Sequence, residues 1–252
     1  MRIATFNILS GRSVAEGFDE ERFRAAIESL DADILGLQEV DRNQPRSGHA
    51  DLTAIAAAAM GATHRLFVPA LVGPPATWSA ATGEEGPDSP AYGIALLSRY
   101  AVLDWRVVRL PAAPVRTPHH SPGRVLPRWV RDEPRVAVVG EVETPRGRVD
   151  VVATHLSFLR PWNARQLRRL TSALDPRPHP LLLLGDLNMG PRAATRITGM
   201  TPLAAGATFP ADRPRVQIDH ILGDRVTAPH GGEVMRLPVS DHRALVVDMD
   251  DD

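Results

Sequence analysis

Eight polar residues stand where apolar, strand-like runs of the chain end or are interrupted. Their side chains are carboxylates, amides and imidazoles, which offer oxygen and nitrogen ligands. In layered α/β folds, ligand sites lie in the crevice beyond the strand ends. A cluster of such groups suits a hard cation such as Mg²⁺ or Mn²⁺ beside a phosphate. The residues are Asn7, Glu39, His155, Asp186, Asn188, Asp219, Asp241 and His242.

Two short spacings favour the same chemistry. Asp186 and Asn188 are two residues apart, so in an extended chain both side chains point to one face. One can take a proton from water while the other holds that water or a phosphate oxygen. Asp241 and His242 are adjacent and point apart. One can therefore reach a metal while the other reaches the phosphate, or a proton relay, from another side.

Each of these residues also has a purely structural interpretation. Asn7 could be a turn residue, Glu39 a surface acid, and Asp186 a loop or cap residue. Short motifs give many false positives, so no single residue decides between the interpretations. All of the structural interpretations would have to hold together in one chain, which favours a shared site.

Short apolar runs alternate with helical patterns, which predicts an α/β fold. Asp19 is a predicted N-cap, and the helix after it has a stripe of Phe23, Ala26, Ile27 and Leu30. Asn163 with Gln166 predicts a capping box before a face of Leu167, Leu170 and Leu174. A third helix is expected at 52–60 and a hairpin turn at 145–147. Strands are expected at 2–9, 34–40, 92–98, 136–142, 149–154, 181–184, 216–222 and 244–249.

Two stretches rich in Pro, Gly and polar residues, 72–91 and 111–134, interrupt this pattern. Loops of such length inside a compact domain are usually functional or disordered. Strands of similar composition resume on both sides, so we expect a single domain over 1–252. We predict that both loops overhang the site and select the substrate; excursions of the surface without that role are the alternative. The residues behind this prediction are Trp78, Arg116, Arg124, Arg128, Trp129 and Arg131.

The composition excludes several classes of protein. The chain has 252 residues, 43% hydrophobic and 23% charged, as in an ordinary soluble protein. It has no cysteine, which excludes disulfides, thiolate catalysis and zinc–thiolate sites. No apolar run is long enough for a membrane span and no signal peptide is visible, so we expect a cytoplasmic protein. The net charge of −1 is unlike that of a dedicated nucleic-acid binder. Every basic residue is arginine, which a GC-rich genome explains more simply than phosphate recognition.

Seven short motifs follow one another along the chain. They are Thr5-Phe6-Asn7-Ile8, Leu37-Gln38-Glu39-Val40, Tyr92 to Arg99, Thr154-His155-Leu156, Gly185-Asp186-Leu187-Asn188, Ile218-Asp219-His220-Ile221 and Ser240-Asp241-His242. In this order the chain resembles the endonuclease/exonuclease/phosphatase superfamily, from residue 2 to about residue 249. The resemblance implies the DNase I-like fold, a four-layer α/β sandwich in which two mixed β-sheets pack face to face with helices outside.

The resemblance also implies roles on the metal and water side of the site. Glu39 resembles the principal metal ligand, helped by Asn7 and by Asp241 on the far side. Asp186 resembles the group that activates or orients the attacking water, with Asn188 beside it. The number of ions and the identity of the general base stay open.

On the phosphate side, His155 and His242 resemble the pair that contacts the scissile phosphate and stabilises its developing charge. Asp219 resembles the carboxylate that fixes the orientation and tautomer of His242. Glu133 is expected to orient His155 in the same way.

The expected activity is that of a metal-dependent phosphodiesterase or phosphomonoesterase. Thr-His-Leu at His155 is similar to the DNase, sphingomyelinase, deadenylase and inositol-phosphatase side of the superfamily rather than to abasic-site endonucleases. The segment 41–48 resembles bacterial members with mostly unassigned substrates, and Ile94 replaces the Asn of their commoner Tyr-Gly-Asn-Ala motif. A nuclease, an inactive binding module and an interaction protein are the alternatives. The near-neutral charge favours a small or lipid-like phosphoester over duplex DNA, and we expect a monomer.

Overall fold

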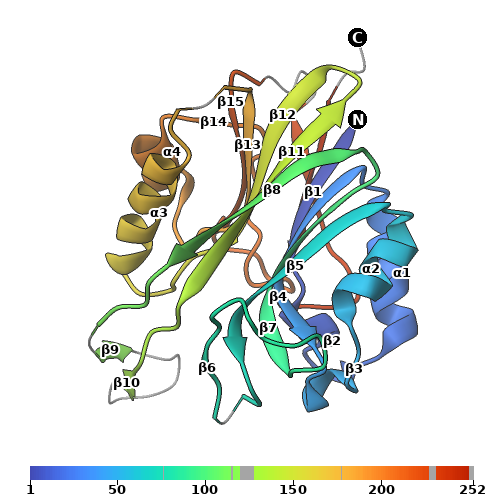
Figure 1. Cartoon of the computed structure of the whole chain (residues 1–252), viewed down its shortest axis with the longest axis vertical. Helices are drawn as coiled ribbons and strands as arrows, with labels where there is room; N and C mark the ends of the chain where they lie inside the picture. Colours follow the sequence, from blue (N-terminus) through green and yellow to red (C-terminus); the bar gives the residue numbers. More distant parts are fainter. Residues whose placement is uncertain (76, 115, 120–127, 177, 227–230, 250–252) are drawn as a thin grey trace.

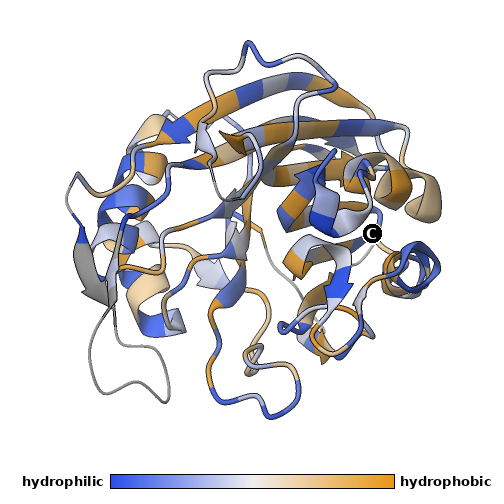
Figure 2. Cartoon of the chain, turned by 90° about the horizontal axis from the view of Figure 1, so that it is seen from below, coloured by the Kyte–Doolittle hydropathy of each residue, from blue (hydrophilic) through white to orange (hydrophobic). Residues whose placement is uncertain are grey.

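Strands occupy the centre of the molecule and helices lie along two outer sides (Figure 1). The computed structural model describes all residues except 76, 115, 120–127, 177, 227–230 and 250–252. A view from below shows the same arrangement, with strands between the two groups of helices (Figure 2). The predicted four-layer α/β sandwich is confirmed.

Seven strands form the first large sheet of the described chain, with β1 (Arg2–Asn7) near its centre. β1 pairs in parallel with β4 (Ile34–Arg42) and antiparallel with β17 (Ala244–Asp248). Both parallel strands therefore end on the same side of the sheet. The remaining members are β16 (Gly232–Met235), β7 (Ala91–Ser98), β5 (His64–Val72) and β6 (Ser79–Ala80).

Six strands form the second large sheet, in which β12 (Gly147–His155) and β13 (Leu181–Asp186) run in parallel. β11 (Arg135–Thr144) joins β12 through the predicted hairpin turn. The other members are β15 (Asp219–Asp224), β14 (Thr201–Pro202) and β8 (Val102–Leu110). Two short ribbons, β2 (Arg12–Ser13) with β3 (Gly17–Phe18) and β9 (Thr117–His119) with β10 (Arg128–Val130), lie outside the large sheets.

The two sheets pack against each other through apolar side chains that alternate along the strands. In β13, Leu182 and Leu184 enter the core between the sheets, whereas Leu181 and Leu183 pack under the helices on the other face. Period-two alternation produces this division. At Gly36 a Cβ atom would lie 3.3 Å from that of Leu184, so the absence of a side chain allows the sheets to approach closely.

Four α-helices of the described chain cover the outer faces. α1 (Glu20–Leu30) and α2 (Leu52–Met60) pack on the first sheet, and α3 (Trp162–Ala173) and α4 (Pro191–Thr198) on the second. The Asp19 side chain accepts a hydrogen bond from the Arg22 amide at 2.7 Å, which confirms the predicted N-cap. Short 3₁₀ turns occupy Leu9–Gly11 and Pro45–Ser47. None of the described helices is long and apolar enough to cross a membrane.

Two predicted strands extend into residues that have left the sheet. β1 ends at Asn7 instead of continuing to Leu9, because Leu9 has a φ of 46° and turns the chain into a 3₁₀ helix. β15 begins at Asp219, since Val216 pairs separately with Phe209.

Strands β5 and β8 were not predicted at all. β8 has one largely exposed face, as an edge strand does, and so it lacks a long apolar run.

The predicted capping box at Asn163 is also wrong. The N-cap of α3 is Pro161, and no side chain caps it. Asn163 and Gln166 are both 2% exposed and lie on the buried face of the helix. They make hydrogen bonds to loops beside the strand ends, which are described below.

The two long loop segments contain short strands of their own. β6 lies in the first segment, and β9 and β10 lie in the second. All three project from the lower end of the molecule in Figure 1, opposite the N-terminus. This is the end toward which β1 runs. Arg124 lies outside the described residues, as does the side chain of Arg128.

Candidate active site

The carboxyl ends of β1 and β13, one from each sheet, contact each other across the sandwich. Asn7 ends β1 and Asp186 ends β13, and both side chains are buried. The Asn7 Nδ2 atom lies 3.2 Å from Oδ2 of Asp186 and 3.2 Å from Oε1 of Glu39. One amide nitrogen therefore bridges two carboxylates that are far apart in sequence.

Glu39 reaches this position through an irregularity in β4. The pairing with β7 shifts between Gln38 and Val40, and Glu39 has a φ of 57°. A β-bulge of this kind redirects one side chain out of the alternation of its strand. The strand continues to Arg42 after the bulge, so Glu39 interrupts β4 rather than follows it.

Asp186 is placed by the glycine before it. Gly185 has a φ of 144°, and a Cβ atom there would lie 1.9 Å from the Thr154 carbonyl oxygen. Only glycine permits this approach of β13 to β12. The extended Asp186–Asn188 geometry predicted from sequence is wrong, because Asn188 has a φ of 50°. The backbone amide of Asn188 donates to Oδ1 of Asp186 at 2.9 Å. A tight turn therefore holds the two residues close together.

His242 is held by a carboxylate. Its Nδ1 atom lies 2.9 Å from Oδ2 of Asp219, and its Nε2 atom lies 3.9 Å from Oδ2 of Asp186. The ring also packs against Phe209, with centroids 4.9 Å apart. Burial disfavours the charged ring, but the Asp219 carboxylate outweighs this effect and raises the pKa of His242 to about 10. His242 is therefore an imidazolium at neutral pH, and both of its ring nitrogens carry protons.

His155 has the opposite electrostatic environment. An Arg135 guanidinium nitrogen lies 3.3 Å from its Nδ1 atom. Two donors approach this ring: Arg135 at Nδ1, and the Asn188 side-chain nitrogen at 3.4 Å from Nε2. Because Arg135 is the charged and closer donor, and Asn188 also donates to the Leu156 carbonyl at 3.0 Å, we assign the ring proton to Nε2. Burial, together with the Arg135 charge, holds the pKa of His155 well below its usual value. His155 is thus a neutral donor whose Nε2 atom lies 3.5 Å from Oδ2 of Asp186.

Glu133 does not orient His155 directly. Its carboxylate lies 3.3 Å from the Arg135 guanidinium, and Arg135 is the group that contacts the imidazole. Arg135 is 5% exposed and was not among the predicted site residues. The one sequence feature that could have indicated Arg135 is its place at the start of an apolar strand, directly after Glu133-Pro134.

Two carboxylates in the site carry an electrostatic cost, the buried Asp186 and the half-buried Glu39. Burial raises the pKa of Asp186 to about 7, and the neighbouring Asp219 carboxylate adds to the rise. Burial also raises the pKa of Glu39; the Asn7 hydrogen bond opposes this effect, whereas Asp241 adds to it. A bound cation would relieve both costs. Asp186, Asp219 and His242 also form a buried acidic and histidine cluster with ligand atoms within 4.8 Å of one another.

The donor set fits a hard divalent cation. Glu39 and Asp186 supply carboxylate oxygens on two sides of the Asn7 amide. The Asn7 Oδ1 atom accepts from the Leu9 amide, so ligation by Asn7 requires a half-turn of its side-chain amide. In the cluster with Asp219, the Nδ1 atom of His242 is already engaged by Oδ2 of Asp219 at 2.9 Å.

Contacts within the described residues join seven of the eight residues predicted from sequence: Asn7, Glu39, His155, Asp186, Asn188, Asp219 and His242. Asp241 is adjacent to His242 in the chain, and its charge raises the pKa of both Glu39 and His242. The side-chain Nδ2 atom of Asn188 lies 3.4 Å from Nε2 of His155 and donates to the Leu156 carbonyl at 3.0 Å.

A buried polar network supports the loops that carry these residues. Asn163 of α3 donates to the Asn188 carbonyl at 2.8 Å. Gln166 accepts from the Ser157 amide at 2.8 Å, and the Ser157 hydroxyl donates to Asp132 at 2.5 Å. Asp132 accepts in turn from the Ala113 amide at 2.8 Å. The network thus ties α3 and both ends of the second long segment to the loop after His155.

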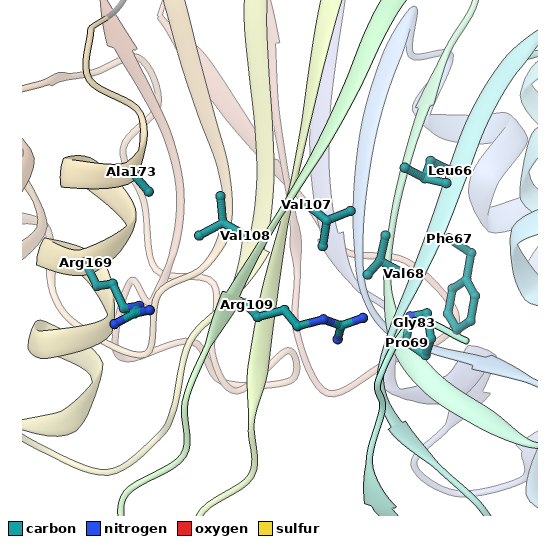
Figure 3. A pocket seen from close by; sticks show the side chains of 10 residues that line it. All are labelled: Leu66, Phe67, Val68, Pro69, Gly83, Val107, Val108, Arg109, Arg169 and Ala173. Atoms are coloured by element: carbon teal, nitrogen blue, oxygen red, sulfur yellow. The ribbon is translucent and has the colours of Figure 1, made fainter. Parts of the chain in front are cut away.

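A large cavity of about 770 Å³ lies away from these residues. It opens between β5, β8 and α3, with the side chains of Arg109 and Arg169 beside it (Figure 3). The Arg109 guanidinium donates to the Ala81 carbonyl at 3.0 Å. None of the eight predicted site residues lines this cavity.

Solved structures with the same fold come from several organisms. An endonuclease/exonuclease/phosphatase from Beutenbergia cavernae DSM 12333 is 25% identical, with 98% of this chain and 70% of that chain covered and a TM-score of 0.68. The mannosyl-6-phosphatase Bt3783 of Bacteroides thetaiotaomicron VPI-5482 is 15% identical, with 98% of each chain covered and a TM-score of 0.62. Sphingomyelinase C from Streptomyces griseocarneus is 17% identical, with 99% of each chain covered and a TM-score of 0.62.

The sequence match to a family covers the site. A comparison with curated proteins finds no match. The sequence model of the endonuclease/exonuclease/phosphatase family matches residues 4–242, which include every residue of the candidate site. This match covers most of the chain, and the fold and the clustered site residues agree with it. The chain therefore belongs to the endonuclease/exonuclease/phosphatase family.

Proposed function

We propose that this protein is a divalent-metal-dependent hydrolase that cleaves phosphoester bonds by attack of water. One observation carries the proposal. The buried Asp186 carboxylate lies 3.5 Å from Nε2 of His155 and 3.9 Å from Nε2 of His242. A proton acceptor beside two proton donors can take a proton from the attacking water while the donors stabilise charge on a phosphate group.

Asn7, Glu39 and Asp241 are the residues that would hold the cation. When bound, Mg²⁺ or Mn²⁺ would polarise the phosphoryl oxygen as a Lewis acid. The oxygen-rich donor set and the desolvation of the half-buried Glu39 carboxylate support this assignment.

The remaining residues act on protons and developing charge. Asp186 accepts a hydrogen bond from the attacking water and takes its proton, and Asn188 fixes the Asp186 carboxylate through its backbone amide. His242 donates from Nε2 to a phosphoryl oxygen as an imidazolium, a state that Asp219 maintains. His155 donates from Nε2 as a neutral ring. The two donors together bind the charge that accumulates in the transition state.

A small or lipid-like phosphoester is the substrate class that we favour. The formal charge of −1 offers little attraction for a polyanion such as duplex DNA. The similar structures include a mannosyl-6-phosphatase and a sphingomyelinase C. The family and the sandwich fold alone do not select a substrate, so this choice rests on charge.

Hydrolysis of bis-p-nitrophenyl phosphate tests the reaction. We expect activity with Mg²⁺ or Mn²⁺, loss of activity in EDTA, and loss in Asp186→Asn. Asp104→Asn, which changes an exposed acid on β8, is the matched control and should be fully active. Full activity in EDTA would contradict the proposal. Efficient plasmid nicking at physiological salt that is lost in Asp186→Asn would make the protein a nuclease.

A further inference from the structure

A cleft of about 620 Å³ lies between the two long segments beside the candidate active site. Trp78 of the first segment lines it, together with Arg116, Arg131 and Glu133 of the second. The candidate catalytic and metal-binding residues do not line it. The cleft therefore adds a surface to which the proposed reaction assigns no role.

Two arginines line this cleft. Arg116 directly precedes β9 and Arg131 directly follows β10. These two strands pair antiparallel, and the last printed pair joins Thr117 to Val130, so the two arginines flank the same end of the ribbon. Both arginines are exposed.

The nearby carboxylates do not neutralise this pair. Glu133 pairs with Arg135 at 3.3 Å. Asp132 is buried and accepts from Ser157 and from the Ala113 amide. Within the described part of the chain, neither Arg116 nor Arg131 has an acidic side chain within ion-pair distance. Two arginines and two carboxylates thus line the cleft, and the carboxylates are engaged by other groups, which leaves the two guanidinium groups for a ligand.

Trp78 gives the cleft a fixed aromatic wall. Its ring lies 5.6 Å from that of Tyr92, and the Arg46 guanidinium lies 5.7 Å from its centroid. Arg46 is itself held by two hydrogen bonds of 2.8 Å to Asp41. A ring fixed in this way offers an apolar surface for a sugar or base at little cost in conformational entropy.

The cleft is coupled to the catalytic residues by short links. Glu133 contacts Arg135, and Arg135 contacts His155. Asp132 holds the Ser157 hydroxyl two residues after His155. Glu133 of the cleft lining is thus connected to His155 through Arg135.

We propose that this cleft binds a second, non-scissile phosphate of the substrate, so that the protein prefers phosphoesters that carry another phosphate group on their sugar. This inference rests on the proposed function and narrows its substrate class. Arg116 and Arg131 bind the second phosphate by charge-assisted hydrogen bonds, and Trp78 packs against the ring that links the two phosphates.

Matched substrates test the preference. One pair of diesters is thymidine 5′-(p-nitrophenyl phosphate) with and without a 3′-phosphate, and one pair of monoesters is glucose 1,6-bisphosphate and glucose 1-phosphate. We expect kcat/KM to be about ten-fold higher for the member with the extra phosphate in the pair that is hydrolysed. A preference within the thymidine pair would identify a nucleotide as the carrier of the second phosphate, and a preference within the glucose pair would identify a sugar. Equal kcat/KM within both pairs would overturn the inference.

Arginine variants locate the preference. The double variant Arg116→Ala, Arg131→Ala should lose it through a higher KM, with hydrolysis of bis-p-nitrophenyl phosphate unchanged within about two-fold. Arg131→Lys, which keeps the charge, should retain part of it. Arg146→Ala, an exposed arginine in the distant β11–β12 turn, is the control and should retain all of it. A double variant that keeps the preference would overturn the assignment to this cleft.

A binding measurement separates this inference from the proposed reaction. Calorimetry in EDTA with thymidine 3′,5′-bisphosphate and glucose 1,6-bisphosphate needs no turnover. At least one of them should bind the wild-type protein about ten-fold more tightly than the double arginine variant. Equal affinities for both compounds would refute the cleft even in an active enzyme. If no phosphoester is hydrolysed, the proposed function fails, and the calorimetric result alone decides whether the cleft binds phosphate.

Discussion

The Nδ1 atom of His242 lies 2.9 Å from Oδ2 of Asp219, and both side chains are buried where the two sheets meet. The pair comes from segments more than twenty residues apart, at the start of β15 and in the loop before β17. The carboxylate fixes the ring and keeps it protonated, so its loss should affect turnover more than substrate binding.

Asp219→Asn should therefore lower kcat by about two or more orders of magnitude and leave KM nearly unchanged, by analogy with other His–Asp pairs. Steady-state kinetics on bis-p-nitrophenyl phosphate measure both values. Circular dichroism is the control for folding, since the Asn side chain has the same shape. Near wild-type turnover in this variant would refute a role for the pair.

Glu39→Gln should weaken the binding of Mg²⁺ or Mn²⁺, because it removes the charge of the predicted principal ligand while keeping the side-chain size. We expect at least a ten-fold higher Kd in titration calorimetry with the metal alone. Glu143→Gln, at an exposed position of β11, is the matched control. Unchanged metal affinity in Glu39→Gln would place the ion elsewhere.

Asp186→Asn should stabilise the metal-free fold at high pH. Burial and Asp219 raise the pKa of Asp186 from its unfolded value of 3.8 to about 7. Because the pKa is raised in the folded state, protonation of Asp186 stabilises the fold at pH values below the unfolded pKa. This stabilisation is lost as the pH rises from about 4 through about 7. Thermal unfolding in EDTA should therefore give a higher Tm for the variant than for wild type at pH 8.

This difference in Tm should shrink toward pH 4, where the wild-type carboxyl is protonated. Part of it is offset at every pH at which His242 is charged, because Asp186 attracts the imidazolium. Asp104→Asn should show no such pH dependence. A Tm at pH 8 equal to or below that of wild type would show that the buried carboxylate carries no net cost.

Arg135→Met should release the ring of His155. The variant removes the donor to Nδ1, a hydrogen bond from a charged group worth roughly 1.5–3 kcal/mol, so kcat should fall about ten-fold or more. The Arg135 charge also depresses the pKa of His155, so the pKa should rise in the variant. Imidazole ¹⁵N NMR reads both effects, as an Nε2–H tautomer in wild type and a mixture in the variant. Arg148→Met is the control, and an unchanged tautomer would exclude the contact.

Asn163→Ala should loosen the turn at Asn188. It leaves the Asn188 carbonyl without its 2.8 Å donor, which costs roughly 1–3 kcal/mol of folding stability for a buried group. We expect a lower denaturation midpoint in urea and a lower kcat, with a smaller effect on KM. Ser172→Ala on the exposed face of α3 should change neither. A variant with normal kcat would make Asn163 purely structural.

The sequence determined which polar residues stand at the strand ends and most of the secondary structure near them. Local signals were sufficient where local physics decides the outcome: Asp19 caps α1 through its own side chain, and period-two apolar runs such as Leu181–Leu184 form central strands. The strand-end positions of Asn7 and Asp186 were visible because strands bury apolar residues and leave ligand-binding residues at their ends.

Only the tertiary structure decided how these residues meet. Arg135 looked like an ordinary strand residue until the fold placed it against His155. Asn163 and Gln166 match a capping pattern, but tertiary hydrogen bonds to Asn188 and Ser157 override that local preference. Asp186 and Asn188 converge through a left-handed turn rather than an extended chain. Each of these contacts joins segments whose sequence separation carries no local signal, or depends on a backbone angle that no residue type fixes alone.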